Sequence, residues 1–246
     1  MSFSNLGLSD KVLAAVAAAG YVSPTPIQEK AIPHVLARKD VLGIAQTGTG
    51  KTAAFVLPML TMLEKGRARA RMPRTLILEP TRELAAQVKE QFDKYGAGQK
   101  LTVALLIGGV SFRDQDSKLM RGVDVLIATP GRLLDHFERG RILLNDVKIL
   151  VIDEADRMLD MGFIPDVEKI AGLLPQFRQT LLFSATMPPE IQRLADRFLS
   201  NPKRVAVAPP ASPAATVVQH LVYADERNKR AVLRQLIEAE QVRNAL

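Results

Sequence analysis

A glycine-rich segment that ends in a lysine and a threonine contains the first residues suited to chemistry. It runs Ala45-Gln46-Thr47-Gly48-Thr49-Gly50-Lys51-Thr52 and follows a short apolar run at 41–44. In a phosphate loop, glycines let backbone amides turn toward phosphates, the lysine reaches the terminal phosphates, and the last hydroxyl is a ligand of Mg²⁺. The fit is imperfect, because Ala45 stands where the general pattern has its first glycine. We interpret the segment as a phosphate loop.

The same segment has two other interpretations. Gly48, Gly50 and Ala53 match the spacing of a dinucleotide-binding fingerprint. In that interpretation Glu79, at the end of the next predicted strand, is placed to bind a ribose. The segment could also be a glycine-rich turn without a ligand, although the adjacent Lys51 and Thr52 are the residues that phosphate and metal require.

Two adjacent carboxylates, Asp153 and Glu154, follow another apolar run at 149–152. Because parallel strands end at the same edge of a sheet, this segment and the phosphate loop would open onto one crevice. Asp153 can hold Mg²⁺, directly or through water, and Glu154 can orient or deprotonate the water that attacks a γ-phosphate. A dehydrogenase has no use for this pair. Carboxylates also favour helix starts for electrostatic reasons alone, but the phosphate loop makes that the lesser explanation.

Short β-branched runs alternate with helical patterns over most of the chain. This alternation predicts an α/β fold with a mostly parallel central sheet and helices on both faces. One predicted helix begins near Glu190 and has Ile191, Leu194 and Phe198 on one face. The predicted strands cover residues 41–44, 75–78, 102–107, 125–128, 149–152, 180–183 and 204–207.

Composition limits the class of protein. The 246 residues are 47% hydrophobic, which is enough to bury one large core. Lys and Arg number 33 against 26 Asp and Glu, and the formal charge of +7 favours a polyanionic partner such as nucleic acid or an anionic membrane. The chain has no cysteine, which excludes disulfides and thiolate chemistry and fits a reducing compartment. No apolar run is long enough to span a bilayer, so we expect a cytoplasmic protein without a membrane partner.

The composition changes near the carboxyl end. Residues 209–216 are rich in proline and alanine, which is typical of an extended linker. A strand pattern at 217–223 and a helical pattern around 232–237 follow. One strand and one helix cannot form a core. We therefore expect residues 1–208 to form one domain and residues 217–246 to be the truncated beginning of a second.

The phosphate loop and the acidic segment resemble the DEAD-box family of ATP-dependent RNA helicases, and most closely its bacterial RhlE-type branch. The family's name spells Asp153-Glu154-Ala155-Asp156, and the family has alanine at the position of Ala45. The resemblance covers essentially residues 1–208. It implies a RecA-like domain that binds ATP and Mg²⁺, with Lys51, Asp153 and Glu154 as catalytic residues and Thr52 and Asp153 on the metal. It also implies a second RecA-like domain, missing here, without which activity should be weak.

An upstream segment resembles the family's adenine-reading Q motif. It runs Gly20-Tyr21-Val22-Ser23-Pro24-Thr25-Pro26-Ile27-Gln28, and Phe3 stands at the position of the motif's isolated aromatic residue. A glutamine amide offers a donor and an acceptor together, which suits the N6 and N7 edge of adenine. The resemblance implies nucleotide contacts for Phe3, Tyr21, Pro26 and Gln28.

Three further segments match the family's RNA-binding motifs, each after a predicted strand. They are Pro80-Thr81-Arg82-Glu83-Leu84-Ala85, Gly108-Gly109 and Thr129-Pro130-Gly131-Arg132. Hydroxyl groups, guanidinium groups, glycine amides and helix amino termini suit the sugar-phosphate backbone, which implies little sequence preference. Taken singly, each could be a turn or a solvated side chain. Glu79 departs from the small or apolar residue expected before Pro80, and we expect its carboxylate near the RNA path.

Ser184-Ala185-Thr186 resembles the family segment that couples hydrolysis to strand separation, and Asp156 is its expected partner. A helix cap is the other explanation for these short hydroxyl side chains.

The stretch 65–74 has five basic residues and no acidic one. We interpret it as a solvated loop, because it leads into the amino end of a strand, away from the proposed groove. Three functions from other classes stay open at this point: a DNA-directed motor with a similar core, a dinucleotide-binding oxidoreductase, and a structural RNA-binding module.

Overall fold

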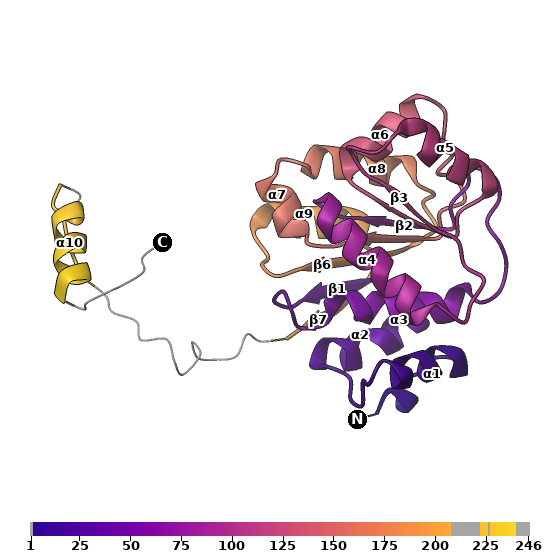
Figure 1. Cartoon of the computed structure of the whole chain (residues 1–246), viewed down its shortest axis with the longest axis horizontal. Helices are drawn as coiled ribbons and strands as arrows, with labels where there is room; N and C mark the ends of the chain where they lie inside the picture. Colours follow the sequence, from indigo (N-terminus) through magenta and orange to yellow (C-terminus); the bar gives the residue numbers. More distant parts are fainter. Residues whose placement is uncertain (1, 208–221, 226, 240–246) are drawn as a thin grey trace. The chain divides into compact units, whose positions relative to one another are not determined.

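A seven-stranded parallel sheet forms the centre of the protein (Figure 1). The computed structural model describes residues 2–207, 222–225 and 227–239. The strand order is β3-β4-β2-β5-β6-β1-β7, and each of these neighbouring pairs is parallel. The strands are β1 (Val41–Ile44), β2 (Thr75–Leu78), β3 (Val103–Leu106), β4 (Val125–Ala128), β5 (Ile149–Ile152), β6 (Gln179–Ser184) and β7 (Lys203–Ala206).

The strands form where the sequence has continuous apolar runs. Such runs are typical of parallel strands, which are covered on both faces. The strands β2, β4, β5 and β6 are buried at every position. The parallel α/β fold predicted from the sequence is confirmed. The predicted bounds of β1, β2, β4 and β5 are those observed, and those of β3, β6 and β7 differ by one residue at each end.

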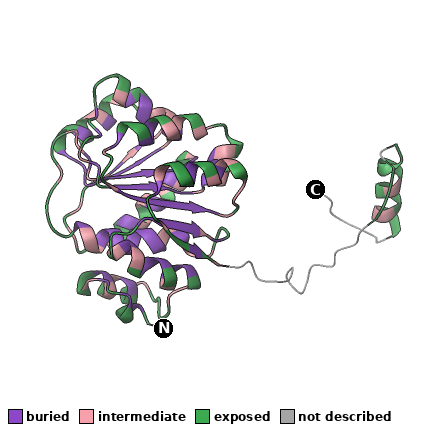
Figure 2. Cartoon of the chain, turned by 180° about the vertical axis from the view of Figure 1, so that it is seen from behind, coloured by how far each residue is buried: buried purple, intermediate pink, exposed green. Residues whose placement is uncertain are grey.

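Helices cover both faces of the sheet, so that the strands are buried and the outer helix surfaces are exposed (Figure 2). One face packs against α1 to α4 and the other against α5 to α9. The first group comprises α1 (Asp10–Ala18), α2 (Pro26–Leu36), α3 (Lys51–Leu63) and α4 (Arg82–Tyr95), preceded by a 3-10 helix, Phe3–Asn5. The second comprises α5 (Phe112–Arg121), α6 (Pro130–Glu138), α7 (Ala155–Asp160), α8 (Ile164–Leu173) and α9 (Pro189–Phe198).

Alternate residues of each strand face opposite helix layers, as the pleat requires. Ile77 of β2 and Val151 of β5 pack in the core beneath α1 to α4. Leu78 and Ile152, the last residues of the same strands, pack in the core on the other side. The residue that follows each of these strands therefore returns to the side of α3 and the phosphate loop.

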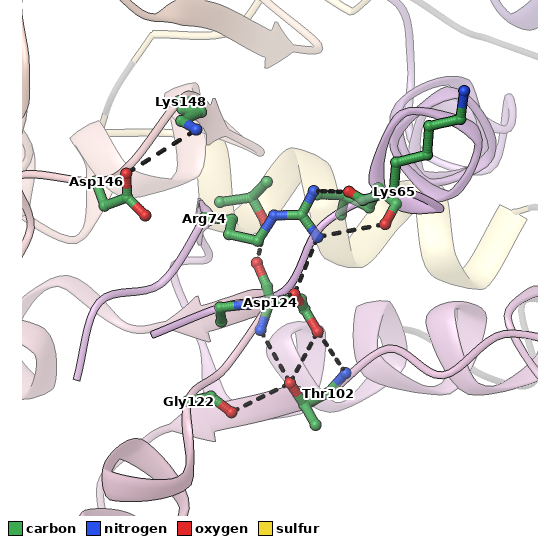
Figure 3. Close-up of polar contacts among 10 residues, drawn as sticks. Lys65, Arg74, Thr102, Gly122, Asp124, Asp146 and Lys148 are labelled. Carbon is green, nitrogen blue, oxygen red and sulfur yellow. Dashed lines mark hydrogen bonds and ion pairs between the residues drawn. The ribbon is translucent and has the colours of Figure 1, made fainter. Parts of the chain in front are cut away.

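The amino edge of the sheet is held by Asp124 (Figure 3). Its carboxylate accepts hydrogen bonds from Arg74 Nη1, from the amide of Ala68, and from both the amide and the hydroxyl of Thr102, at 3.0 to 3.1 Å. The side chain of Arg74 is only 13% exposed. The basic stretch 65–74 does lie at the amino end of β2, but the prediction that it is solvated was wrong for Arg74, which is an internal anchor.

The chain divides into two units, Met1–Pro209 and Pro210–Leu246. In the second unit the structure describes α10 (Lys229–Ala239), which has no buried residue. The predicted linker 209–216 and residues 217–221 of the predicted strand lie outside the described residues, and Val222 and Tyr223 do not belong to a strand. No helix in the described ranges is long and apolar enough to cross a membrane.

Candidate functional site

The phosphate-loop segment joins β1 to α3 at the carboxyl edge of the sheet. Gly48 and Gly50 have φ angles of +84° and +91°, in the left-handed region that favours glycine. Ala45 is not among the residues with positive φ. Its amide donates to the carbonyl of Ser184 at 3.1 Å, so it continues the pairing of β1 with β6. The first position of this loop therefore needs no glycine, and alanine fits it.

A cavity of about 520 Å³ lies beside this loop. Its size is that of a small-molecule or cofactor site. A Cβ atom built on Gly48 would meet nothing within 4 Å, so the loop leaves open space there. The residues predicted to bind nucleotide or metal that line it are Phe3, Tyr21, Gln28, Thr47, Gly48, Gly50, Lys51, Thr52, Asp153 and Glu154. Pro26, Gln46 and Thr49, which were also predicted to contact nucleotide, do not line it.

Lys51, which is buried, and Glu154, which is partly buried, form an ion pair in the lining of this cavity. Lys51 Nζ lies 3.1 Å from Glu154 Oε1, and the side chains are 4% and 13% exposed. The same ammonium donates to the carbonyl of Ala45 at 2.8 Å. The sheet topology therefore brings the loop after β1 and the acidic segment after β5 into contact, as the sequence predicted.

Asp153 is buried at the end of β5. Its Oδ1 accepts a hydrogen bond from the amide of Glu154 at 2.9 Å. Burial, and next the nearby Glu154 carboxylate, raise the pKa of Asp153 to about 7, although Lys51 acts in the opposite direction. Glu154 has a φ of +49°, a strained conformation for a non-glycine residue that costs about 1–3 kcal/mol. Such strain concentrates at functional sites.

Glu79 does not lie where the sequence analysis placed it. It was expected near the RNA path, but it lines the cavity and is 1% exposed. Burial, and next the negative charges of Asp153 and Glu154, raise the pKa of Glu79 well above its usual range. The alternation of side chains between the two faces of the sheet could have located it. Glu79 is the first residue after β2, as Asp153 is after β5, so both side chains point to the same face.

Gln28 connects the Q-motif segment to the phosphate loop. Its Nε2 donates to the carbonyl of Gly50 at 3.2 Å, and its Oε1 accepts from the amide of Thr25 at 3.0 Å. An amide side chain has two N–H groups and two acceptor lone pairs. One donor and one acceptor of Gln28 therefore remain for a ligand. Phe3 lines the cavity as a buried member of the core.

Asp156 is hydrogen-bonded to the segment after β6. Its Oδ2 accepts from the amide and the hydroxyl of Thr186 at 2.9 and 3.0 Å, and its amide donates to Ser184 Oγ at 3.2 Å. Burial acts to raise the pKa of Asp156, but the hydrogen bonds from Thr186 and Ser184 outweigh it and hold the pKa below its usual value. The expected contact between these residues is present, while its coupling role stays a prediction.

The three segments predicted to bind RNA lie after the neighbouring strands β2, β3 and β4 and contact one another. Arg82 Nη1 donates to the carbonyl of Gly108 at 3.4 Å. Arg132 Nη2 donates to the carbonyl of Val110. Gly109 has a φ of +77°, and a Cβ atom there would press on the guanidinium of Arg82. Thr81 caps α4 by accepting from the amide of Leu84, and Thr129 and Pro130 begin α6 with Gly131.

Two residues that the sequence analysis missed hold this cluster. Gln115 Nε2 donates to the carbonyl of Ile107 at 2.9 Å, and its Oε1 accepts from Arg132 Nε at 3.0 Å. His136 Nε2 lies 2.8 Å from the same Oε1. The Arg132 guanidinium also stacks over Phe112, at 3.3 Å from the ring centroid. The available signal was the position of Gln115 on the apolar side of an amphipathic helix. Nothing in the sequence gives the hydrogen-bond partners of Gln115.

The parallel sheet, the phosphate loop after β1 and the acidic pair after β5 define a RecA-like P-loop domain. The family described as DEAD/DEAH box helicase matches residues 25–194, and the chain belongs to this family.

Relatives and solved structures agree with this assignment. The chain is 44% identical over 240 residues to the ATP-dependent RNA helicase CshA of Limosilactobacillus reuteri, covering 98% of this chain and 48% of that protein. It is 43% identical over 239 residues to the DEAD-box ATP-dependent RNA helicase RhpA of Helicobacter pylori, covering 97% and 48%. The chain thus spans about half the length of these curated relatives.

Among solved structures, a DEAD box protein from the hyperthermophile Methanococcus jannaschii is similar, with a TM-score of 0.79 and 37% identity, over 97% of this chain and 63% of that one. A hypothetical ATP-dependent RNA helicase from Sulfolobus tokodaii has a TM-score of 0.75 and 36% identity, over 81% and 57%.

Proposed function

We propose that this chain provides the ATP- and Mg²⁺-binding half of an ATP-dependent RNA helicase of the RhlE-type branch. In this proposal it binds the RNA backbone with little sequence preference and contributes to RNA-stimulated ATP hydrolysis that separates short duplexes. The observation that carries the proposal is the 3.1 Å contact of Lys51 with Glu154 in the cavity beside the phosphate loop. Similar proteins named as ATP-dependent RNA helicases support it.

The residues around the cavity have the chemistry that the ligands need. Mg²⁺, when bound, neutralises charge on the phosphate oxygens. In our proposal Asp153 and Thr52 hold the metal, partly through water, and Lys51 binds the terminal phosphates. Glu154 then orients the attacking water. The donor set fits the metal, because hard oxygen ligands are those that Mg²⁺ prefers.

Adenine is the base that we propose for the nucleotide. The free N–H group and lone pair of Gln28 match the N6 and N7 edge of adenine. Phe3 and Tyr21 line the same cavity and can contact the base or the sugar. Because Gln28 also donates a hydrogen bond to the carbonyl of Gly50, the residue proposed to bind the base is linked directly to the loop proposed to bind the phosphates.

RNA is the polyanion that we propose for the segments after β2, β3 and β4. Arg82, Arg132 and the amides around Gly108, Gly109 and Gly131 suit phosphate oxygens. A cytoplasmic location without a membrane partner is part of the same proposal.

A second RecA-like domain would complete the ATPase site, and the greater length of the relatives leaves room for one. An arginine supplied in this way is worth a factor of about 10³ to 10⁵ in rate. We therefore expect this chain to bind nucleotide well and to hydrolyse it slowly. Equal RNA-stimulated rates for this chain and for a protein that includes the second domain would contradict this part of the proposal.

Nucleotide and nucleic-acid competition tests the proposal. A fluorescent ADP analogue should bind in the presence of Mg²⁺, and ATP should displace it better than NAD does. Lys51→Ala should weaken binding about 10- to 100-fold, since a hydrogen bond to a charged group contributes about 1.5–3 kcal/mol. The exposed Lys11→Ala is the control. NAD binding that survives Lys51→Ala would indicate a dinucleotide enzyme, and preference for DNA over RNA oligomers would indicate a DNA motor.

A further inference from the structure

Glu79 is a buried carboxylate with an oxygen that has no hydrogen-bond partner. In the described part of the chain, Oε1 of Glu79 is inaccessible to solvent and unbonded. An unsatisfied buried polar group destabilises the folded protein, and more so when it is charged. The carboxylate is therefore unfavourable for the protein alone. A ligand in the cavity that Glu79 lines would remove this penalty.

The position of Glu79 follows from the register of the sheet. Leu78 of β2 pairs with Ile152 of β5, so Glu79 and Asp153 are equivalent positions at the ends of adjacent strands. The amide of Asp153 donates to the carbonyl of Leu78 at 3.1 Å, which continues that pairing by one residue. Neighbouring strands lie about 4.8 Å apart. Both carboxylates therefore approach the phosphate loop from the same face of the sheet.

The charges around this point favour a divalent cation. Four carboxylates, those of Glu79, Glu90, Asp153 and Glu154, line the cavity with a single ammonium group, that of Lys51. Yet the described residues contain no group of three or more Asp, Glu, His or Cys side chains placed to hold a metal ion directly. Mg²⁺ in proteins usually keeps several of its waters. The arrangement therefore fits a carboxylate that contacts the metal through water.

We propose that Glu79 is a positioning residue for the metal and that its carboxylate accepts a hydrogen bond from a water of the Mg²⁺ held by Asp153. The inference rests on the proposed function, because it requires a magnesium nucleotide in this cavity. Partners of this kind typically change metal affinity about 10- to 100-fold. Glu79 would thus set how strongly Mg²⁺ promotes nucleotide binding.

The experiment compares nucleotide affinity with and without metal. A fluorescent ADP analogue is titrated into the chain in saturating Mg²⁺ and again in EDTA. The readout is the dissociation constant in EDTA divided by the dissociation constant in Mg²⁺. Glu79→Gln should lower this ratio about tenfold, with the change confined to the Mg²⁺ measurement. Glu138→Gln is the matched control, since Glu138 is exposed and forms a surface ion pair with Lys169 outside the proposed sites. It should leave the ratio unchanged.

Each outcome has one meaning. A Glu79→Gln variant that melts like the wild type and keeps the wild-type ratio overturns the inference and leaves the proposed function standing. A wild-type chain that binds no nucleotide in Mg²⁺ overturns the proposed function itself. If Glu79→Gln does not fold, Glu79→Ala is measured in the same way. A ratio for that variant equal to the wild type again overturns the inference.

Discussion

Lys51 and Glu154 form an ion pair, with 3.1 Å between Nζ and Oε1. One is proposed to bind the terminal phosphates and the other to orient the attacking water. An arriving phosphate must therefore compete with Glu154 for the ammonium. The ion pair compensates the charge of the buried Lys51, which would be costly to leave unpaired, and that of the partly buried Glu154.

Glu154→Gln should separate binding from hydrolysis. The neutral amide competes less for Lys51 and does not repel phosphate, so the affinity for a magnesium nucleotide should stay equal or rise a few-fold. Loss of a group that orients or deprotonates water should slow single-turnover hydrolysis by about 10² or more. Glu138→Gln is the control, because Glu138 forms an exposed pair with Lys169. Weaker nucleotide binding by Glu154→Gln would contradict the claim that Glu154 and the phosphate compete for the Lys51 ammonium.

Gln115→Ala should weaken RNA binding and leave nucleotide binding unchanged. The substitution removes the acceptor for Arg132 Nε and the donor to the carbonyl of Ile107. A loss of about 1–1.5 kcal/mol of RNA-binding free energy, because Arg132 is no longer held in position, would lower RNA affinity about 5- to 10-fold. Ser117→Ala, on the exposed side of the same helix, is the control. Fluorescence anisotropy with a labelled single-stranded RNA measures the effect, and equal affinities for both variants would exclude the positioning role of Gln115.

His136 should make the stability of the protein depend on pH. Burial, and to a lesser degree the charges of Arg132 and Arg139, lower its pKa, although Asp116 acts in the opposite direction. The unfolded chain then binds a proton at higher pH than the folded protein. The free energy of unfolding should therefore fall as pH drops through about 6.5, the ordinary histidine value.

His136→Gln should remove this part of the pH dependence. Urea unfolding at several pH values between 5 and 8 provides the comparison. The difference in unfolding free energy between wild type and variant should shrink toward acid pH. Two curves that run parallel over this range would show that His136 does not titrate as described.

Asp124→Ala should destabilise the protein without affecting the ligand site. The substitution removes the carboxylate that pairs with the largely buried Arg74 guanidinium, and breaking one side of a buried pair costs about 3–5 kcal/mol. Asp146, which approaches Lys148 at 4.0 Å with side chains 27% and 68% exposed, is the matched control (Figure 3). Asp146→Ala should change stability by no more than about 0.5 kcal/mol. Urea unfolding measures both variants. Similar losses of unfolding free energy for Asp124→Ala and Asp146→Ala would refute the special role of Asp124.

The sequence predicts the sheet well for a physical reason. Parallel strands buried on both faces leave continuous apolar runs, and each run here ends where a polar segment begins. Because all such strands end at one edge of the sheet, the sequence alone predicts that the phosphate loop and Asp153 lie close together. The contact of Asp156 with Thr186 followed from the family pattern in the same way.

Side-chain direction and internal hydrogen bonds could not be predicted as well. Glu79 was expected near the RNA path but lines the cavity, because the pairing of β2 with β5 that places it beside Asp153 cannot be seen in the residues of either strand alone. Arg74 belongs to a basic stretch, and its burial depends on Asp124, fifty residues away in the sequence. Gln115 and His136 meet through the packing of α5 against α6, and no local pattern records that contact.

The end of β2 has a consequence for protein engineering. Within four consecutive residues, Glu79 lines the cavity beside the phosphate loop and Arg82 bonds to the carbonyl of Gly108. A loop graft that exchanges residues 79–82 for those of another protein would therefore alter both proposed ligand sites in one operation. Grafts at 108–109 or 129–132 leave the residues that line the cavity in place. Chimeras meant to change the proposed RNA contacts alone should be built at those two loops.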